Sequence, residues 1–404
     1  MSKIDELIQQ YCPDGVEWVK LVDVCDKVCS GGTPSRGKGD YFTGNIPWLR
    51  TQEVDWKDVY GTEIKITEEA VINSSAKIIP ENCVIVAMYG ATAGKVCINK
   101  IPLTTNQACC NLQINPHKAH YKFVYYCVCN EYENIKSLGQ GSQNNINAQI
   151  VKNYLIPVPP LPVQEEIVKI LDTFTELQAE LQAELQARQQ QYQYYRDKLL
   201  SFEGRSDVKW TKLGDVTDLL SGFPFNSTQF TDYGVRLMRG VNIKRGQLCF
   251  NDTDDRFWKS SEGLDKYIVN ENDIVISMDG SLVGKSFGMV KEEHLPLLLV
   301  QRVARIRSSV VNINYIFHCI NNWFPNYVDK KKTHGAIPHI SMKDIANFTV
   351  PIPSIKEQER IASTLDRFDT LVNDLSQGLP AEIEARKQQY EYYRDKLLSF
   401  KKKA

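Results

Sequence analysis

The sequence predicts an α+β fold in which one unit occurs twice. Three observations predict it: an internal repeat that covers the chain, a heptad seam of apolar residues in each copy, and short strand-like runs between polar loops. We therefore expect two mixed α/β domains separated by two long helices that form an antiparallel coiled coil. The whole would be a tandem repeat with pseudo-two-fold symmetry.

The repeat is strongest near its end. Residues 188–202 and 386–400 agree at 13 of 15 positions, and the match runs back at an offset of 194 residues through Tyr121 and Tyr315. Weaker matches pair Trp18 with Trp210, and 88–95 with 278–285. The sequence therefore predicts two variable parts, 1–155 and 205–350, each followed by a near-constant segment, 156–204 and 351–404.

Each near-constant segment begins with prolines and continues as a predicted helix. No proline or glycine interrupts 163–203, so one helix of about 40 residues is expected there, about 60 Å long. Its heptad columns are Leu171, Gln178, Leu185, Tyr192 and Leu199, and then Phe174, Leu181, Arg188, Tyr195 and Phe202. The second segment carries a four-residue stutter beside Gly378 and Pro380, which predicts an irregular or broken helix.

The sequence Glu-Leu-Gln-Ala occurs three times in a row, from Glu176, Glu180 and Glu184. Each copy adds about 6 Å to a helix, so we interpret the repeat as an adjustable spacer. A plain amphipathic helix is the alternative.

The helices carry more aromatic residues than a two-helix seam needs, and aromatic residues favour protein interfaces. Ordinary core packing is the alternative. The predicted partner-binding residues are Tyr192, Tyr195, Phe202, Tyr390, Tyr393 and Phe400.

In the variable parts, 83–87 and 273–277 have the pattern of buried strands, and 121–132 and 315–324 that of single helices. A run from Gly280 to Ser286 resembles a phosphate-binding loop. It has three residues between its glycines where a Walker loop has four. We expect a hairpin-like glycine turn there instead.

Composition excludes several classes of protein. The longest apolar runs are about six residues, far short of a membrane span, and no signal peptide is apparent, so a cytoplasmic location is expected. The 11 cysteines have poor spacing for zinc and are predicted to be free thiols without a metal site. No catalytic motif stands out, so a binding protein is favoured over an enzyme.

With a net charge of −1, nucleic-acid binding would depend on local basic patches. Basic and amide side chains gather in the loops, and such side chains contact phosphates, guanine and adenine. The candidate DNA-binding residues in the first variable part are Arg36, Lys38, Arg50, Gln52, Lys95, Gln107, Gln143, Asn144 and Asn145. Those in the second are Arg239, Asn242, Lys244, Arg245, Lys285, Gln301, Arg302, Lys331, Lys332, His334 and His339.

Taken together, the chain resembles a specificity subunit of a type I restriction-modification enzyme. The tandem layout, Trp18 and Trp210 with their following leucines, the proline-rich helix entries and the endings at 194–202 and 392–400 carry the resemblance. It covers essentially all 404 residues. It implies that each variable part is a target-recognition domain for one half of a bipartite, asymmetric DNA site.

The resemblance also implies partners. The helices would set the half-site separation and hold two methyltransferase subunits, which would bring S-adenosylmethionine, and translocase-nuclease subunits would join them. The chain itself would bind no cofactor and catalyse nothing. Two other readings stay open: a coiled-coil structural adaptor with two protein-binding domains, and an enzyme that uses the glycine-lysine turns.

Overall fold

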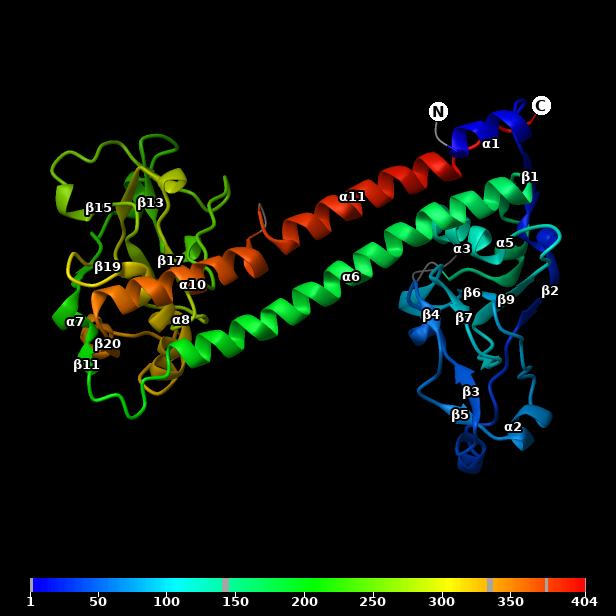
Figure 1. Cartoon of the computed structure of the whole chain (residues 1–404), viewed down its shortest axis with the longest axis horizontal. Helices are drawn as coiled ribbons and strands as arrows, with labels where there is room; N and C mark the ends of the chain where they lie inside the picture. Colours follow the sequence, from blue (N-terminus) through cyan, green and yellow to red (C-terminus); the bar gives the residue numbers. More distant parts are fainter. Residues whose placement is uncertain (1–2, 140–144, 333–336, 375–376, 404) are drawn as a thin grey trace. The chain divides into compact units, whose positions relative to one another are not determined.

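The computed structural model describes residues 3–139, 145–332, 337–374 and 377–403 (Figure 1). The chain divides into two compact units. Unit 1 comprises residues 1–182 and 383–404, and unit 2 comprises residues 183–382. Each unit therefore combines one variable part with pieces of both near-constant segments.

Unit 1 is built from short strands and helices around a long helix. Its elements are α1 (Lys3–Tyr11), β1 (Glu17–Lys20), β2 (Cys25–Ser30), β3 (Ile46–Leu49), β4 (Asp58–Val59), β5 (Lys65–Ile66), α2 (Glu68–Ile72), β6 (Val84–Ala87), β7 (Val96–Asn99), β8 (Thr104–Thr105), β9 (Cys109–Ile114), α3 (Tyr121–Asn130), α4 (Tyr132–Ser137), α5 (Ala148–Asn153), β10 (Leu155–Val158), the first part of α6 (Leu161–Leu199) and most of α11 (Leu379–Leu398).

Unit 2 follows a similar order with fewer helices in its variable part. Its elements are the rest of α6, β11 (Lys209–Lys212), α7 (Leu213–Val216), β12 (Asp218–Ser221), β13 (Val235–Met238), β14 (Phe257–Trp258), β15 (Ile268–Val269), β16 (Ile274–Ser277), β17 (Phe287–Met289), β18 (Leu297–Leu299), β19 (Val303–Arg307), α8 (Ile313–Asp329), α9 (Met342–Asn347), β20 (Thr349–Ile352), α10 (Ile355–Asn373) and the start of α11.

The sheets correspond between the units. The order β2-β9-β6-β7-β4 in unit 1 matches β12-β19-β16-β17 in unit 2. A second sheet in each unit contains a parallel strand pair, β3 with β8 in unit 1 and β13 with β18 in unit 2. Every residue of β6 and of β16 is buried. The two buried-strand predictions are thereby confirmed, because a continuous apolar run suits a strand covered on both faces.

Proline is accommodated where the near-constant segments begin. Pro157 lies in β10 opposite Trp18 of β1, and Pro351 lies in β20 opposite Trp210 of β11. Both pairs are two-stranded ribbons, where a residue without an N–H group is tolerated. The proline-containing entries to the helices are therefore paired strands.

The helix α6 is continuous over 39 residues, and its proline falls in the first turn, where no N–H group is needed. Phe202, predicted to continue the seam, lies beyond the helix end and is buried in the core of unit 2. The second segment is broken between α10 and α11. A side chain at Gly378 would come within 2.3 Å of the Thr370 carbonyl oxygen, so glycine is required at this break.

Within each unit, the long helices pair through aromatic residues. In unit 1, the Phe174 ring of α6 stacks 5.5 Å from Tyr393 of α11, and α11 ends beside the beginning of α6, so the pair is antiparallel (Figure 1). In unit 2, Phe368 of α10 stacks 5.5 Å from Tyr195 of α6. Each unit thus takes its near-constant aromatic segment from the other repeat.

One helix prediction was wrong. Residues 121–132 form two helices, α3 and α4, because the backbone at Glu131 leaves the helical region (φ −92°, ψ 11°). The other predicted helix, 315–324, is confirmed as part of α8.

Candidate nucleic-acid interface

A tight turn follows the first parallel strand in each unit, and an arginine begins it. We call residues Arg50–Glu53 and Arg239–Asn242 the arginine turns. In unit 1 the Arg50 backbone N–H donates to the Glu53 carboxylate at 3.2 Å, and in unit 2 the Arg239 backbone N–H donates to the Asn242 amide oxygen at 3.2 Å. The same type of hydrogen bond therefore closes the turn in both units, although the two sequences otherwise differ.

The arginine side chains brace these turns. The Arg50 guanidinium donates to Glu53 at 3.3 Å and forms an ion pair with Glu63. The Arg239 guanidinium donates to the Asp254 carbonyl oxygen at 2.8 Å. Asn242 is fully buried and donates to Asp255 at 3.1 Å, so its amide supports the turn and offers no exposed surface.

The glycine turns, which are residues 88–95 and 278–285, are hairpins. The first joins the antiparallel strands β6 and β7, and the second joins β16 and β17. Gly90 and Gly94 have φ values of 80° and 86°, and Gly280 and Gly284 have values of 100° and 85°. A phosphate-binding loop instead leads from a strand into a helix, so the hairpin prediction is confirmed.

The two kinds of turn lie together. In unit 1 the Thr92 hydroxyl donates to the Thr51 carbonyl oxygen at 2.9 Å. In unit 2 a side chain at Gly240 would meet the Ser277 hydroxyl at 2.8 Å, where β16 leads into the glycine turn, and the Asp279 carboxylate at 3.9 Å. The arginine turn is thus packed on the glycine turn in both units.

Two further segments join this edge of each unit. Because β3 and β8 are parallel, the segment after β8 lies beside the arginine turn, and the Asn106 N–H donates to the Leu49 carbonyl oxygen at 2.9 Å. The segment before α5 meets the glycine turn, where the Gly90 N–H donates to Asn145 at 3.0 Å. In unit 2, the Gly280 N–H donates to the Pro338 carbonyl oxygen at 3.1 Å.

We call this edge the loop face. In unit 1 it consists of residues 50–53, 88–95, 106–107 and 145–146, and in unit 2 of residues 239–242, 278–285, 301–302 and 338–340. The structure brings these predicted residues onto it: Arg50, Gln52, Lys95, Gln107, Asn145, Arg239, Asn242, Lys285, Gln301, Arg302 and His339.

The other predicted residues lie elsewhere. Arg36 and Lys38 lie in the loop before β3, where Lys38 donates to the Tyr41 hydroxyl at 2.9 Å, a bond that raises the pKa of Lys38. Lys244 and Arg245 occupy an exposed turn after the second arginine turn, and Lys331 and Lys332 follow α8. Gln143, Asn144 and His334 fall outside the residues that the structure describes.

Local acids moderate some of the positive charge. Lys95 pairs with Asp55 at 2.6 Å, and this hydrogen bond lowers the pKa of the Asp55 carboxyl group. Lys332 pairs with Asp329 at 2.7 Å, with the same effect on the pKa of Asp329. Lys285 and Arg302 are exposed on the loop face of unit 2.

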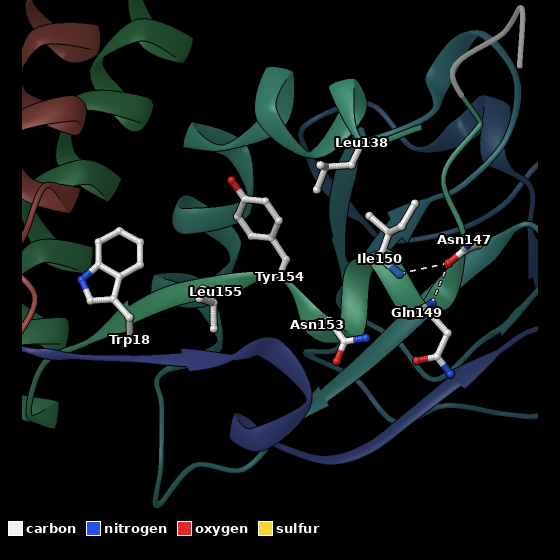
Figure 2. Close-up of a pocket in the computed structure, with 8 residues that line it drawn as sticks. All are labelled: Trp18, Leu138, Asn147, Gln149, Ile150, Asn153, Tyr154 and Leu155. Carbon is white, nitrogen blue, oxygen red and sulfur yellow. Dashed lines mark hydrogen bonds between the residues drawn. The ribbon is translucent and has the colours of Figure 1, made fainter. Parts of the chain in front are cut away.

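Unit 1 also contains a separate pocket of about 690 Å³. Figure 2 shows its lining of Trp18, Leu138, Asn147, Gln149, Ile150, Asn153, Tyr154 and Leu155. The Asn147 oxygen accepts hydrogen bonds from two backbone N–H groups at the start of α5. Among the residues that the structure describes, this lining offers apolar surface, amides, a phenol and an indole, without a carboxylate, histidine or thiol.

All 11 cysteines are free thiols, as predicted. Burial raises the pKa of Cys25, Cys83 and Cys110 to about 12, so these thiols are poor nucleophiles. Among the described residues, no group of three or more histidine, cysteine or acidic side chains is placed to hold a metal ion. In the same part of the chain, no helix is long and apolar enough to cross a membrane.

The predicted partner-binding aromatics divide by exposure. Tyr192 and Phe202 are buried in unit 2, and Tyr390 and Phe400 pack against the core of unit 1. Tyr195 and Tyr393 remain 36% and 37% exposed. More exposed are Tyr194 and Tyr392, at 61% and 62%, which are not among the predicted partner-binding residues. Their positions outside the two heptad columns are the signal that could have identified them.

Comparisons with known proteins agree on one family. The sequence profile described as "Type I restriction modification DNA specificity domain" matches residues 13–188 and 205–385. The chain is 34% identical over 297 residues to the Escherichia coli type I restriction enzyme EcoR124I/EcoR124II specificity subunit, covering 71% of this chain and 72% of that one. It is 29% identical over 400 residues to the E. coli EcoprrI specificity subunit, covering 93% of each.

Solved structures show the same fold. The type I restriction-modification S subunit from M. genitalium superposes with a TM-score of 0.61, 16% identity, and coverage of 95% of this chain and 96% of that one. A chain from a study of complex assembly in the type I R-M system gives a TM-score of 0.59 at 18% identity, covering 96% and 98%.

Proposed function

Because the chain belongs to the family of type I restriction-modification DNA specificity domains, and is a specificity subunit of such a system, we propose that it reads a bipartite, asymmetric DNA site. Unit 1 would read one half-site through residues 1–155 and unit 2 the other through residues 205–350. The near-constant segments 156–204 and 351–404 would hold the two variable parts apart.

The observation that carries the proposal is the loop face. It occurs in both units on the same backbone frame, yet it presents different side chains in each. Bases are distinguished by hydrogen bonds and apolar contacts to their edges. Two different base sequences can therefore be recognised by one backbone arrangement that carries different side chains.

The same reasoning gives the partners. A chain that only reads DNA needs a partner for chemistry, so two methyltransferase subunits would dock, one per repeat, and bring S-adenosylmethionine, with translocase-nuclease subunits joining them. The exposed pairs Tyr194–Tyr195 and Tyr392–Tyr393 support two equivalent docking sites, because each pair sits in the same sequence segment of its repeat. The chain would act in the cytoplasm and would itself catalyse no step.

Replacing residues 205–350 with the corresponding part of another specificity subunit tests this proposal. We expect one half-site of the methylated sequence to change while the other half-site and the gap stay the same. Loss of both half-sites, with the complex still assembled, would contradict the proposal that each unit recognises one half-site.

A further inference from the structure

The arginine turn has room for a single outward residue. Its first residue braces the turn, and its last closes it by accepting from the backbone N–H of the arginine. The second residue faces the glycine turn in unit 1, where the Thr51 carbonyl oxygen accepts from Thr92. In unit 2 it faces the end of β16, where a side chain at Gly240 would meet the Ser277 hydroxyl. The third residue, Gln52 in unit 1 and Val241 in unit 2, is exposed.

These two residues differ in chemistry although their backbones are equivalent. Val241 is 43% exposed, an uncovered apolar side chain in the middle of a polar edge. Gln52 occupies the same place with an amide. The first and last residues therefore support the turn in both units, and the exposed third residue presents a different side chain in each.

The Gln52 amide is oriented by its neighbour. With its oxygen toward Arg50, Gln52 accepts hydrogen bonds from both terminal guanidinium nitrogens at 3.0 Å. In that orientation Arg50 occupies the amide oxygen, so the group that the exposed Gln52 can offer an external partner is its NH₂ donor. Arg50 is itself held by Glu53 and Glu63, which fixes the amide in turn.

In the major groove, guanine presents two adjacent acceptors, O6 and N7, whereas adenine presents an acceptor beside a donor. A donor-only group therefore favours guanine over adenine. Thymine is marked by its C5-methyl group, which makes apolar contacts. An exposed valine suits that methyl group.

We propose that Gln52 and Val241 determine specificity for the two half-sites, with Gln52 selecting a guanine and Val241 a thymine. This inference rests on the proposed function. Arg50 and Arg239 are positioning residues that hold them and do not themselves read bases.

The test is to map methylated sequences made by the chain with its methyltransferase partner, for the unchanged protein and for Gln52→Val and Val241→Gln. Gln52→Val should reduce the preference for guanine at one position of one half-site by about tenfold or more. Val241→Gln should do the same for thymine at one position of the other half-site. The gap should not change in either variant.

Matched controls place the same substitutions away from the loop face. Gln10→Val changes an exposed glutamine of α1, and Val310→Gln changes a valine that is 69% exposed in unit 2. Both should leave the motif unchanged. As a second substitution at the turn, Gln52→Glu exchanges donors for acceptors and should move the preference toward cytosine, which presents a donor.

An unchanged motif in Gln52→Val, Gln52→Glu and Val241→Gln would overturn the inference while leaving the proposed function standing. Changes spread over both half-sites would also overturn it. If the unchanged protein directs no split motif, both the proposed function and this inference fail.

Discussion

Gln164 of α6 and Gln358 of α10 make the same buried contacts in the two units. The Gln164 amide donates to the Pro159 carbonyl oxygen at 2.7 Å and accepts from the His120 N–H at 2.8 Å. The Gln358 amide donates to the Pro353 carbonyl oxygen at 2.8 Å and accepts from the Asn312 N–H at 2.9 Å. Each glutamine thus ties the start of a long helix to the start of a helix in the variable part.

Replacing either glutamine should destabilise its own unit. Gln164→Ala leaves a buried N–H and a buried carbonyl group without partners, which costs about 1–3 kcal/mol for each group. Urea unfolding should show the loss, whereas the exposed Gln186→Ala should unfold as the unchanged protein does. Equal stability of Gln164→Ala and Gln186→Ala would mean that water replaces the lost bonds.

Stability should fall as the solution becomes acidic, partly through His120. Burial lowers the pKa of His120, whose ring accepts a hydrogen bond from the Lys122 N–H at 3.2 Å. The unfolded chain, with a histidine pKa of about 6.5, then takes up the proton more readily than the folded one. Stability is therefore lost as the pH falls from about 7 through the lowered pKa.

His120→Asn keeps an acceptor at this helix start and removes the titration. Urea unfolding at pH 7.5 and pH 5.5 should show a smaller pH effect in His120→Asn than in the unchanged protein. The same substitution at the exposed His117 is the control. An equal pH effect in all three proteins would assign the acid sensitivity to other groups.

The exposed tyrosines should matter for partners and not for folding. Tyr194→Ser and Tyr392→Ser together should weaken methyltransferase binding by about 30-fold or more, since aromatic residues dominate the energy of interfaces. Tyr233→Ser, at a tyrosine that is 64% exposed in the variable part of unit 2, should have no effect. Undiminished co-purification of the double variant, with a normal melting temperature, would place the docking sites elsewhere.

Deleting one Glu-Leu-Gln-Ala copy should shorten the gap between the half-sites by one or two base pairs. The deletion removes about 6 Å of helix, and α6 continues unbroken through all three copies. Sequencing of the methylated sites would reveal the gap. A deletion that altered the bases of a half-site would refute the spacer role.

The repeat and the heptad columns predicted the architecture well, because both are patterns that can be recognised directly in the sequence. The break at Glu131 could not be predicted, since nothing in the residue types there forbids a helix. The paired strands at Pro157 and Pro351 depend on β1 and β11, which lie far away in the chain.

The candidate site was predicted less completely. By residue type alone, Arg50, Gln52 and Asn242 are all candidate DNA-binding residues, although the structure gives them different environments. Asn242 is buried because its amide closes a turn, and Arg50 is engaged by two acids. Val241 could not be found by a search for polar groups, since its significance comes only from its exposed position on the turn.

The most direct test is long-read mapping of methylation in DNA from cells that express the chain with its methyltransferase partner. The account predicts a split motif with N6-methyladenine on both strands, absent when the chain is omitted. No chain-dependent methylation, with both proteins soluble and associated, would contradict it.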